Sequence, residues 1–273
     1  MGISVYDAVM MAGSTRAQAR KGTVVCLGVP KISFSSRSLK KWCERIGVDW
    51  KGPADGAAVN DQPMTPTSFF LSLGYSRCIA LDISAYEGAQ IVHDLNQPEL
   101  AEQHRDIASC VVDCGTLEHV FDIPAALRTI GALLETDGIV LHVTPCNGYL
   151  DHGFYQVSPT LFYDFYSANG FRIVSANLLN RYPVVRCEPY VEDVYRHRDP
   201  LYGVRTMRRS TNFFAAAKTA DSTSDRVPTQ SYYREVHGGP VQQYSAEVGF
   251  SYAFAPSFLR RVAGRVLRRV RAQ

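Results

Sequence analysis

The chain has 273 residues, of which 46% are apolar and 20% are charged, and its formal net charge is +3. These values are ordinary for a soluble globular protein with one large α/β domain or at most two small ones. They exclude a membrane-spanning chain, because no apolar run approaches the ~20 residues that a transmembrane helix needs. The first residues lack the basic start and long apolar core of a signal peptide, so we expect a cytoplasmic protein.

Five short apolar runs, most of them continuous rather than alternating, are predicted to form strands. They lie at 23–28, 78–83, 89–92, 109–113 and 138–144. Continuous apolar runs are typical of strands that helices cover on both faces.

Helical patterns alternate with these runs through about the first 150 residues. Each pairs a capping residue at its start with a glycine at its end: Ser35 or Ser36 with Gly47, Thr65 with Gly74, and Asp122 with Gly138. This alternation predicts an α/β fold with a doubly wound, mostly parallel sheet.

Beyond residue 150 the pattern changes. The segment 158–179 is predicted to form a helix, a turn at Asn169-Gly170 and a strand, and the segment 210–219 to form a final strand. The segment 220–256 is polar and punctuated by glycine and proline, so we expect a linker that is partly disordered. The predicted division is therefore an α/β domain at 1–219, a linker at 220–256 and a C-terminal helix at 257–273.

The C-terminal segment 257–273 holds six arginines and no acidic residue, and without those arginines the net charge of the chain becomes −3. Its apolar residues share one helical face: Phe258, Leu259, Val262, Val266, Leu267 and Val270. This pattern predicts a basic amphipathic helix that lies on an anionic membrane surface, at the inner membrane face, or docks onto a partner protein or the body of the chain. Nucleic-acid binding is the least favoured alternative, because no aromatic residues interleave the arginines.

The seven cysteines are an odd number and include no C-x-x-C pair, which favours reduced thiols over disulfides. Cys110 and Cys114 stand four residues apart on a predicted strand, but no clustered histidines accompany them. We therefore predict no metal site.

Polar residues follow the predicted strands where ligands bind in such sheets, beyond the carboxyl ends. Asp82 ends the second strand, and its carboxylate can accept hydrogen bonds from both ribose hydroxyls of an adenosine cofactor. Asp94 can bind the adenine amino group while Leu95 packs on the ring. Gly115, after the fourth strand, permits close approach of the backbone to a ligand.

Each of these residues also has a purely structural interpretation. An aspartate after a strand is more often a turn or helix cap, and Glu118 can satisfy backbone amides near a helix start. His119 and His142 are each more often structural than catalytic. The ordered set of an acid after strand two, an acid after strand three and "GTLEHV" after strand four favours a functional interpretation.

The segments 81–98, 111–145 and 153–174 together resemble a class I S-adenosylmethionine-dependent methyltransferase. The resemblance covers about 23–218, and "LEHVFD…LL…DGIVLHVTP" is its most specific part. The chain is similar in particular to bacterial methyltransferase-domain proteins linked to glycan or secondary-metabolite assembly. The resemblance implies a Rossmann-like, seven-stranded sheet with an antiparallel last strand, supplied here by 210–219.

The resemblance also implies S-adenosylmethionine as cofactor and a role for several residues. Asp82 would bind the ribose, Asp94 and Leu95 the adenine, and the edge formed by Asp113, Gly115 and Thr116 would flank the methionine part. The loop after the first strand departs from the Gly-x-Gly pattern of the family, because only Gly28 is present and Pro30 lacks an amide donor.

The implied reaction is methyl transfer, and the lack of an "NPPY"-type motif favours O-methylation of a small molecule, sugar or glycan-linked acceptor. A hydroxyl nucleophile is activated by a general base. His152 is the first candidate for this base, and His119 is the second. Phe154 and Tyr155 would form the wall of the substrate pocket. The alternative is a catalytically inactive member of the fold that serves as a binding or scaffold subunit.

Overall fold

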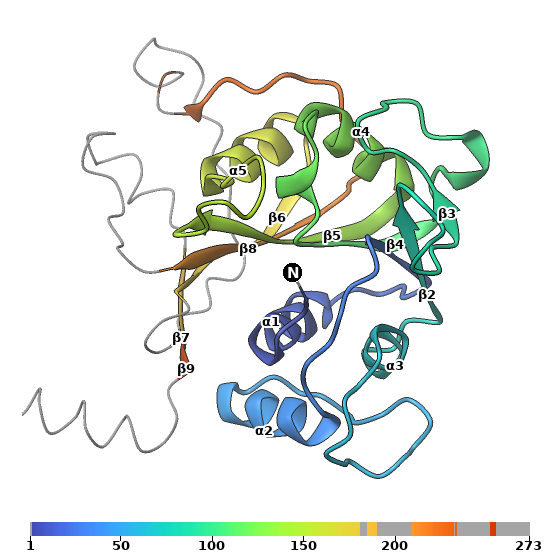
Figure 1. The fold of residues 1–273 in the computed structure, drawn as a ribbon, viewed down its shortest axis with the longest axis vertical. Helices are drawn as coiled ribbons and strands as arrows, with labels where there is room; N and C mark the ends of the chain where they lie inside the picture. Colours follow the sequence, from blue (N-terminus) through green and yellow to red (C-terminus); the bar gives the residue numbers. More distant parts are fainter. Residues whose placement is uncertain (1, 181–184, 190–208, 232, 234–251, 255–273) are drawn as a thin grey trace, which may run out of the picture.

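The computed structural model describes residues 2–180, 185–189, 209–231, 233 and 252–254, and Figure 1 traces the rest in grey. The predicted amphipathic helix at 257–273 lies outside the described residues, and its contacts stay a prediction. Within the described ranges no helix is both long and apolar enough to cross a membrane.

One mixed sheet forms the centre of the molecule (Figure 1). Across the sheet its nine strands follow the order β3-β2-β1-β4-β5-β8-β6-β7-β9. Their bounds in chain order are β1 Thr23–Leu27, β2 Arg77–Asp82, β3 Ile91–Val92, β4 Ala108–Cys114, β5 Leu134–Asn147, β6 Arg172–Asn180, β7 Val185–Pro189, β8 Ser210–Ala217 and β9 Tyr252–Phe254.

The strand directions confirm the predicted fold class. Strands β3, β2, β1, β4 and β5 pair in parallel, and β8 runs antiparallel between β5 and β6. This seven-stranded, mostly parallel part is the Rossmann-like methyltransferase arrangement, and the predicted strand at 210–219 supplies the antiparallel member. Two further strands, β7 and β9, add to the free edge of β6 in antiparallel pairing. The sheet is therefore two strands wider than predicted, and β8 is not the last strand.

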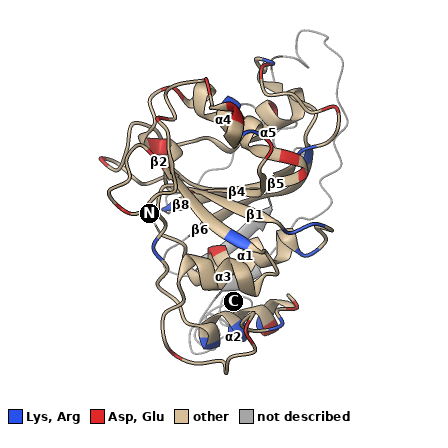
Figure 2. Cartoon of the chain, turned by 90° about the vertical axis from the view of Figure 1, so that its right-hand side faces the viewer, with Lys and Arg blue, Asp and Glu red and all other residues tan. Residues whose placement is uncertain are grey.

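Helices cover both faces of the sheet, as the continuous apolar runs predict (Figure 1). One layer holds α1 (Val5–Thr15), α2 (Ser36–Ile46) and α3 (Pro66–Ser72), and the other holds α4 (Ile123–Leu133) and α5 (Pro159–Ala168). A hydrophobic core lies on each face of the sheet, and alternate residues of β1 pack into one core or the other. Val24 and Cys26 pack on the side of α1 to α3, whereas Val25 and Leu27 pack on the side of α4 and α5. Figure 2 shows the charged residues of α2 in the layer farthest from the sheet.

The predicted caps begin three of these helices. The Ser35, Thr65 and Asp122 side chains each accept a hydrogen bond from the backbone amide three residues later. Helix α2 ends at Gly47, which adopts a φ of +76°.

The helix predicted between Asp122 and Gly138 is shorter in the structure. Helix α4 ends at Leu133 and β5 begins at Leu134, so the predicted end at Gly138 is wrong. Leu134 pairs with Ala108 of β4, which draws the chain into the sheet. The Lys218 ammonium donates to the carbonyls of Gly131 and Leu134 at the helix end. A cation bound to the last carbonyls favours a helix end at this point.

Helix α1 has no counterpart among the predicted elements. It begins with a capping box in which Asp7 Oδ2 accepts from the Ser4 amide at 2.9 Å and the Ser4 hydroxyl accepts from the Asp7 amide. The spacing of Ser4 and Asp7 is the sequence signal that could have revealed this helix.

The described start of the predicted linker packs on α5. The amides of Thr223 and Arg226 donate to the carbonyl and side-chain oxygens of Asn169 at 2.9 and 3.0 Å. The division into domain, linker and tail stays a prediction.

Candidate active site

A cavity of about 500 Å³ lies beyond the carboxyl ends of β1, β2 and β4. Strand order reverses at β1, and ligands bind at this kind of position in open α/β sheets. The volume falls within the range of about 300–1,000 Å³ that is typical of small-molecule sites. The residues that line the cavity follow the three strands or lie near the N-terminus: Gly2, Leu27, Gly28, Val29, Pro30, Lys31, Asp82, Glu87, Cys114, Gly115, Thr116 and His119.

Gly28 brings the loop after β1 against the ends of β2 and β4. Its φ is +72°, and a Cβ atom at this position would lie 3.2 Å from Thr116 Oγ1 and 3.8 Å from Asp82 Oδ2. Only glycine adopts this φ readily and leaves this space open. The Gly28 amide donates to the Leu81 carbonyl at 2.7 Å, so this amide already has a partner.

Asp82 lies at the cavity, where its carboxylate faces the Gly28 backbone. Among the described residues, its Oδ1 atom has one long contact, of 3.4 Å, from the Ser84 amide. A carboxylate at the end of β2 can accept hydrogen bonds from a ligand with two neighbouring hydroxyls. The structure thus brings Gly28 and Asp82 together as the sequence predicts.

Asp94 and Leu95 do not line this cavity. Asp94 Oδ1 accepts hydrogen bonds from the amide and side chain of Asn96, which lowers the pKa of Asp94. Leu95 is buried in the core beside α4 and α5. Asn96 Oδ1 in turn accepts from the amides of Phe121 and Asp122, both at 3.0 Å, and so ties this turn to the start of α4. The adenine role of Asp94 and Leu95 stays a prediction.

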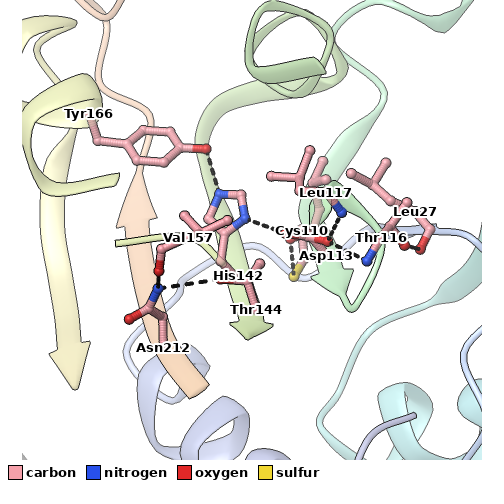
Figure 3. Close-up of polar contacts among 11 residues, drawn as sticks. Leu27, Cys110, Asp113, Thr116, Leu117, His142, Thr144, Val157, Tyr166 and Asn212 are labelled. Atoms are coloured by element: carbon pink, nitrogen blue, oxygen red, sulfur yellow. Dashed lines mark hydrogen bonds and ion pairs between the residues drawn. The ribbon is translucent and has the colours of Figure 1, made fainter. Parts of the chain in front are cut away.

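Asp113 is fully buried beneath the cavity and holds the loop after β4 in place (Figure 3). Its Oδ1 atom accepts from the amides of Thr116 and Leu117 at 3.1 and 3.2 Å. Its Oδ2 atom lies 2.8 Å from His142 Nδ1, and His142 Nε2 lies 2.7 Å from the Tyr166 hydroxyl. Asp113 thus supports the predicted cofactor edge from below.

The direction of these hydrogen bonds follows from Tyr166. Burial and the nearby Asp113 carboxylate raise the pKa of Tyr166 well above its usual value, so the phenol keeps its proton. The phenol then donates to His142 Nε2, and we assign the imidazole proton to Nδ1, which donates to Asp113. His142 is therefore a structural residue, in line with the structural interpretation of its sequence position.

Gly115 and Thr116 line the cavity above Asp113. Gly115 has a φ of +84°, and its amide donates to the Val143 carbonyl at 3.0 Å. The Thr116 hydroxyl donates to the Leu27 carbonyl at 2.6 Å and joins the ends of β1 and β4. These contacts fix the backbone at the predicted cofactor edge.

Glu118, His119 and His152 form a cluster at the edge of this cavity, which we call the Glu–His–His cluster. Glu118 and His119 lie in the short 3-10 helix η2 (Leu117–His119). Glu118 Oε1 lies 3.5 Å from His152 Nε2 and 4.0 Å from His119 Nε2, and the two imidazole rings meet at 5.2 Å between centroids. The two predicted catalytic histidines are therefore neighbours, and His119 lines the cavity.

Burial shifts the pKa values of two members of the Glu–His–His cluster. The Glu118 side chain is 0% exposed, and burial together with the nearby Asp113 carboxylate raises the pKa of Glu118 to about 8. Burial and the neighbouring His152 lower the pKa of His119. His119 is therefore neutral at pH 7, and its imidazole can accept a proton.

The Glu118 backbone clamps the segment that carries His152. Its carbonyl accepts from the amides of Phe154 and Tyr155 at 2.8 and 3.2 Å. A Cβ atom on Gly153 would lie 2.7 Å from this carbonyl, so only glycine allows the approach.

Phe154 and Tyr155 do not line this cavity. Phe154 is 67% exposed and packs edge-on against Phe121. The Tyr155 hydroxyl donates to the Phe121 carbonyl at 3.0 Å, and its ring lines a second, largely apolar cavity of about 280 Å³ beside α4 and α5. Their role as the wall of a substrate pocket stays a prediction.

Sequence reasoning did not assign Gly2 and Glu87 to the cavity or Glu118 to the cluster. Glu118 was expected to serve backbone amides, yet neither of its carboxylate oxygens has a hydrogen-bond partner among the described residues. The sequence feature that could have indicated this cluster is the adjacent pair Glu118-His119, followed later by His152.

Comparison with known proteins finds a methyltransferase model that matches part of the chain. Residues 65–183 match the model of a family described as a methyltransferase domain. This match and the strand order support the resemblance in the sequence to class I S-adenosylmethionine-dependent methyltransferases. S-adenosylmethionine is its expected cofactor. No curated protein matches the chain.

Solved structures with this fold are distant. An N1-methyltransferase of 1,6-didemethyltoxoflavin from Burkholderia thailandensis is 16% identical, with a TM-score of 0.42 and 78% of each chain covered. A SAM-dependent methyltransferase from Archaeoglobus fulgidus is 9% identical, with a TM-score of 0.36 and 77% of this chain and 94% of that chain covered. TehB from Haemophilus influenzae is 13% identical, with a TM-score of 0.40 and 79% and 61% covered. Likenesses this distant carry no argument about the reaction.

Tyr166→Phe tests the buried chain below the cavity. It removes the hydroxyl that satisfies His142 Nε2 and should lower the free energy of unfolding by about 1–3 kcal/mol, the usual cost of an unsatisfied buried polar group. Urea denaturation measures the change. Tyr155→Phe is the matched control, because its hydrogen bond to Phe121 lies at the exposed surface. Equal losses in the two variants would contradict the buried network.

Glu118→Gln tests the raised pKa of Glu118. Folded Glu118 keeps its proton up to about pH 8, whereas the unfolded chain releases it near pH 4.5. The folded state therefore loses stability as pH rises between these values. From pH 5.5 to 8.5 the wild type should lose about 1–3 kcal/mol more than Glu118→Gln, in urea titrations of chelator-treated protein. Glu102→Gln, with a 94% exposed side chain, serves as control and should follow the wild type.

Proposed function

We propose that the chain transfers the methyl group of S-adenosylmethionine to a hydroxyl oxygen of a small molecule, sugar or glycan-linked acceptor. The observation that carries this proposal is the pair of neighbouring imidazoles, His119 and His152, at the edge of the cofactor cavity. A hydroxyl nucleophile must lose its proton as it is methylated, and a neutral imidazole is the usual side chain for this task.

The cavity fits the expected cofactor in size and in chemistry. Asp82 would accept hydrogen bonds from the ribose hydroxyls, since its carboxylate faces the cavity and holds only one long contact. Gly28 and Gly115 both have positive φ and present backbone without a Cβ atom, which leaves room for a ligand beside Thr116. S-adenosylmethionine supplies an electrophilic methyl group on a sulfonium centre.

His119 and His152 would share the proton of the acceptor hydroxyl. The lowered pKa of His119 keeps its imidazole neutral and ready to accept. The Nε2 atom of each ring lies within 4.0 Å of Glu118 Oε1, and the Glu118 carboxyl group can balance the new charge by releasing its own proton to water. Positioning of acceptor and methyl group supplies the rest of the acceleration.

The loop after β1 supports the alternative of an inactive scaffold subunit. The Gly28 amide already donates to Leu81, and Pro30 has no amide hydrogen, so the loop offers fewer donors than a Gly-x-Gly loop would. Cofactor binding decides between the two functions.

Calorimetric titration of the full chain with S-adenosylmethionine is the first test. We expect saturable binding to one site, and at least a tenfold weaker affinity for Asp82→Asn, because hydrogen bonds to a charged acceptor are worth about 1.5–3 kcal/mol. Asp61→Asn, at the exposed ion pair with Arg37, should bind as the wild type does. No heat at millimolar cofactor would favour the scaffold function.

His152→Ala and His119→Ala test the proton acceptors once a screen of hydroxylated compounds has found an acceptor. Each variant should lower kcat by about 10²-fold or more with little change in cofactor affinity, since general-base catalysis contributes about 10²–10⁴-fold. His104→Ala, in the short helix η1 (Glu102–His104), is the control. Unchanged kcat in both active-site variants would remove these histidines from the mechanism.

A further inference from the structure

The Glu118 carboxylate is the least satisfied group of the site. Its side chain is fully buried, and neither oxygen has a hydrogen-bond partner among the described residues. His152 Nε2 is buried and lacks such a partner as well. Buried polar atoms are almost always paired, so two unpaired groups that face each other at 3.5 Å point to a missing partner between them.

We propose that Glu118, His119 and His152 bind a divalent transition-metal ion, such as Zn²⁺ or Mn²⁺, at the edge of the cofactor cavity. One carboxylate and two imidazoles are a donor set that such ions favour, and three protein ligands leave coordination positions open. This proposal differs from the sequence-based prediction of no metal site, which considered the cysteines and found no histidines clustered with them.

The donor atoms are close to the positions that an ion requires. One ligand atom from each residue lies within 4.8 Å of the others, and the Glu118 oxygen is 3.5 and 4.0 Å from the two imidazole nitrogens. Bonds of about 2.0–2.2 Å to a common ion place ligand atoms roughly 3.0–3.5 Å apart. Small side-chain rotations of His119 and His152 would bring their nitrogen atoms to these distances from the Glu118 oxygen.

The backbone holds the three ligands in place without an ion. Glu118 and His119 are adjacent in η2, and Asp113 fixes the start of η2 through the Leu117 amide. The segment with His152 is clamped to the Glu118 carbonyl by two amides and by the close approach of Gly153. A site whose supports exist before the ion arrives binds it with little cost of ordering.

The ion would deepen the proposed function, and this step rests on that function. Since His119 lines the cavity, an open coordination position would face the space where the methyl acceptor must lie. A hydroxyl bound to the ion loses its proton to water more readily. Its oxygen then forms the bond to the methyl carbon, while the sulfonium sulfur keeps the electron pair of the broken bond and becomes a thioether. His119 and His152 would then act as ligands rather than as proton acceptors.

The test is calorimetric titration of untagged, chelator-treated full chain with Zn²⁺. We expect one ion per chain, an affinity at least 100-fold weaker for Glu118→Gln and for His152→Asn, and a Zn²⁺-dependent rise in Tm for the wild type alone. His104→Asn is the matched control and should bind Zn²⁺ as the wild type does. Equal affinity in all variants, or no binding by the wild type, would overturn the proposal in favour of a proton shared by Glu118 and the histidines.

A second measurement needs no variant. Pulsed electron paramagnetic resonance of the wild type with Mn²⁺ should show nitrogen couplings from two histidine ligands, and their absence would overturn the site even if a variant failed to fold. Titration with S-adenosylmethionine is independent of the ion. Cofactor binding without Zn²⁺ binding would refute the metal site alone, whereas Zn²⁺ binding without cofactor binding would refute the methyltransferase function alone.

Discussion

The Asp113 carboxylate is the constraint on which the site depends. One oxygen holds the amides of Thr116 and Leu117, and the other holds His142, which Tyr166 of α5 fixes from the far side (Figure 3). A single buried charge thus joins the end of β4, the neighbouring strand β5 and a helix of the covering layer. Such a charge is tolerated in a core because hydrogen bonds satisfy both of its oxygens.

The same carboxylate shapes both halves of the site. Through Thr116 it supports the edge of the cavity against Gly28, and through Leu117 it begins the short helix that carries Glu118 and His119. Burial raises the pKa of Glu118 most, and the Asp113 charge raises this pKa further, since two nearby carboxyl groups disfavour a second negative charge. The cavity and the Glu–His–His cluster therefore share one structural support.

The sequence predicts the parts of this arrangement that depend on local pattern. Strand runs, capping residues and the meeting of Gly28 with Asp82 follow from hydrophobicity, turn chemistry and parallel pairing. The sequence does not show that Leu95 is buried in the core beside α4 and α5, since this depends on how the turn after β3 packs. Nor does it show that the Glu118 carboxyl group is buried without a hydrogen-bond partner among the described residues, because burial depends on tertiary packing. The β7 and β9 pairing was missed because short edge strands carry little hydrophobic signal.

The central claim is that the cavity beside Gly28 holds the cofactor although the loop after β1 contains a single glycine. A crystal structure with S-adenosylhomocysteine tests this most directly. We predict the ribose hydroxyls at the Asp82 carboxylate and the homocysteine part between Gly28 and Gly115, with the sulfur directed toward His119. A ligand bound elsewhere, or a cavity filled by the Val29 side chain with no ligand at saturating concentration, would contradict the account.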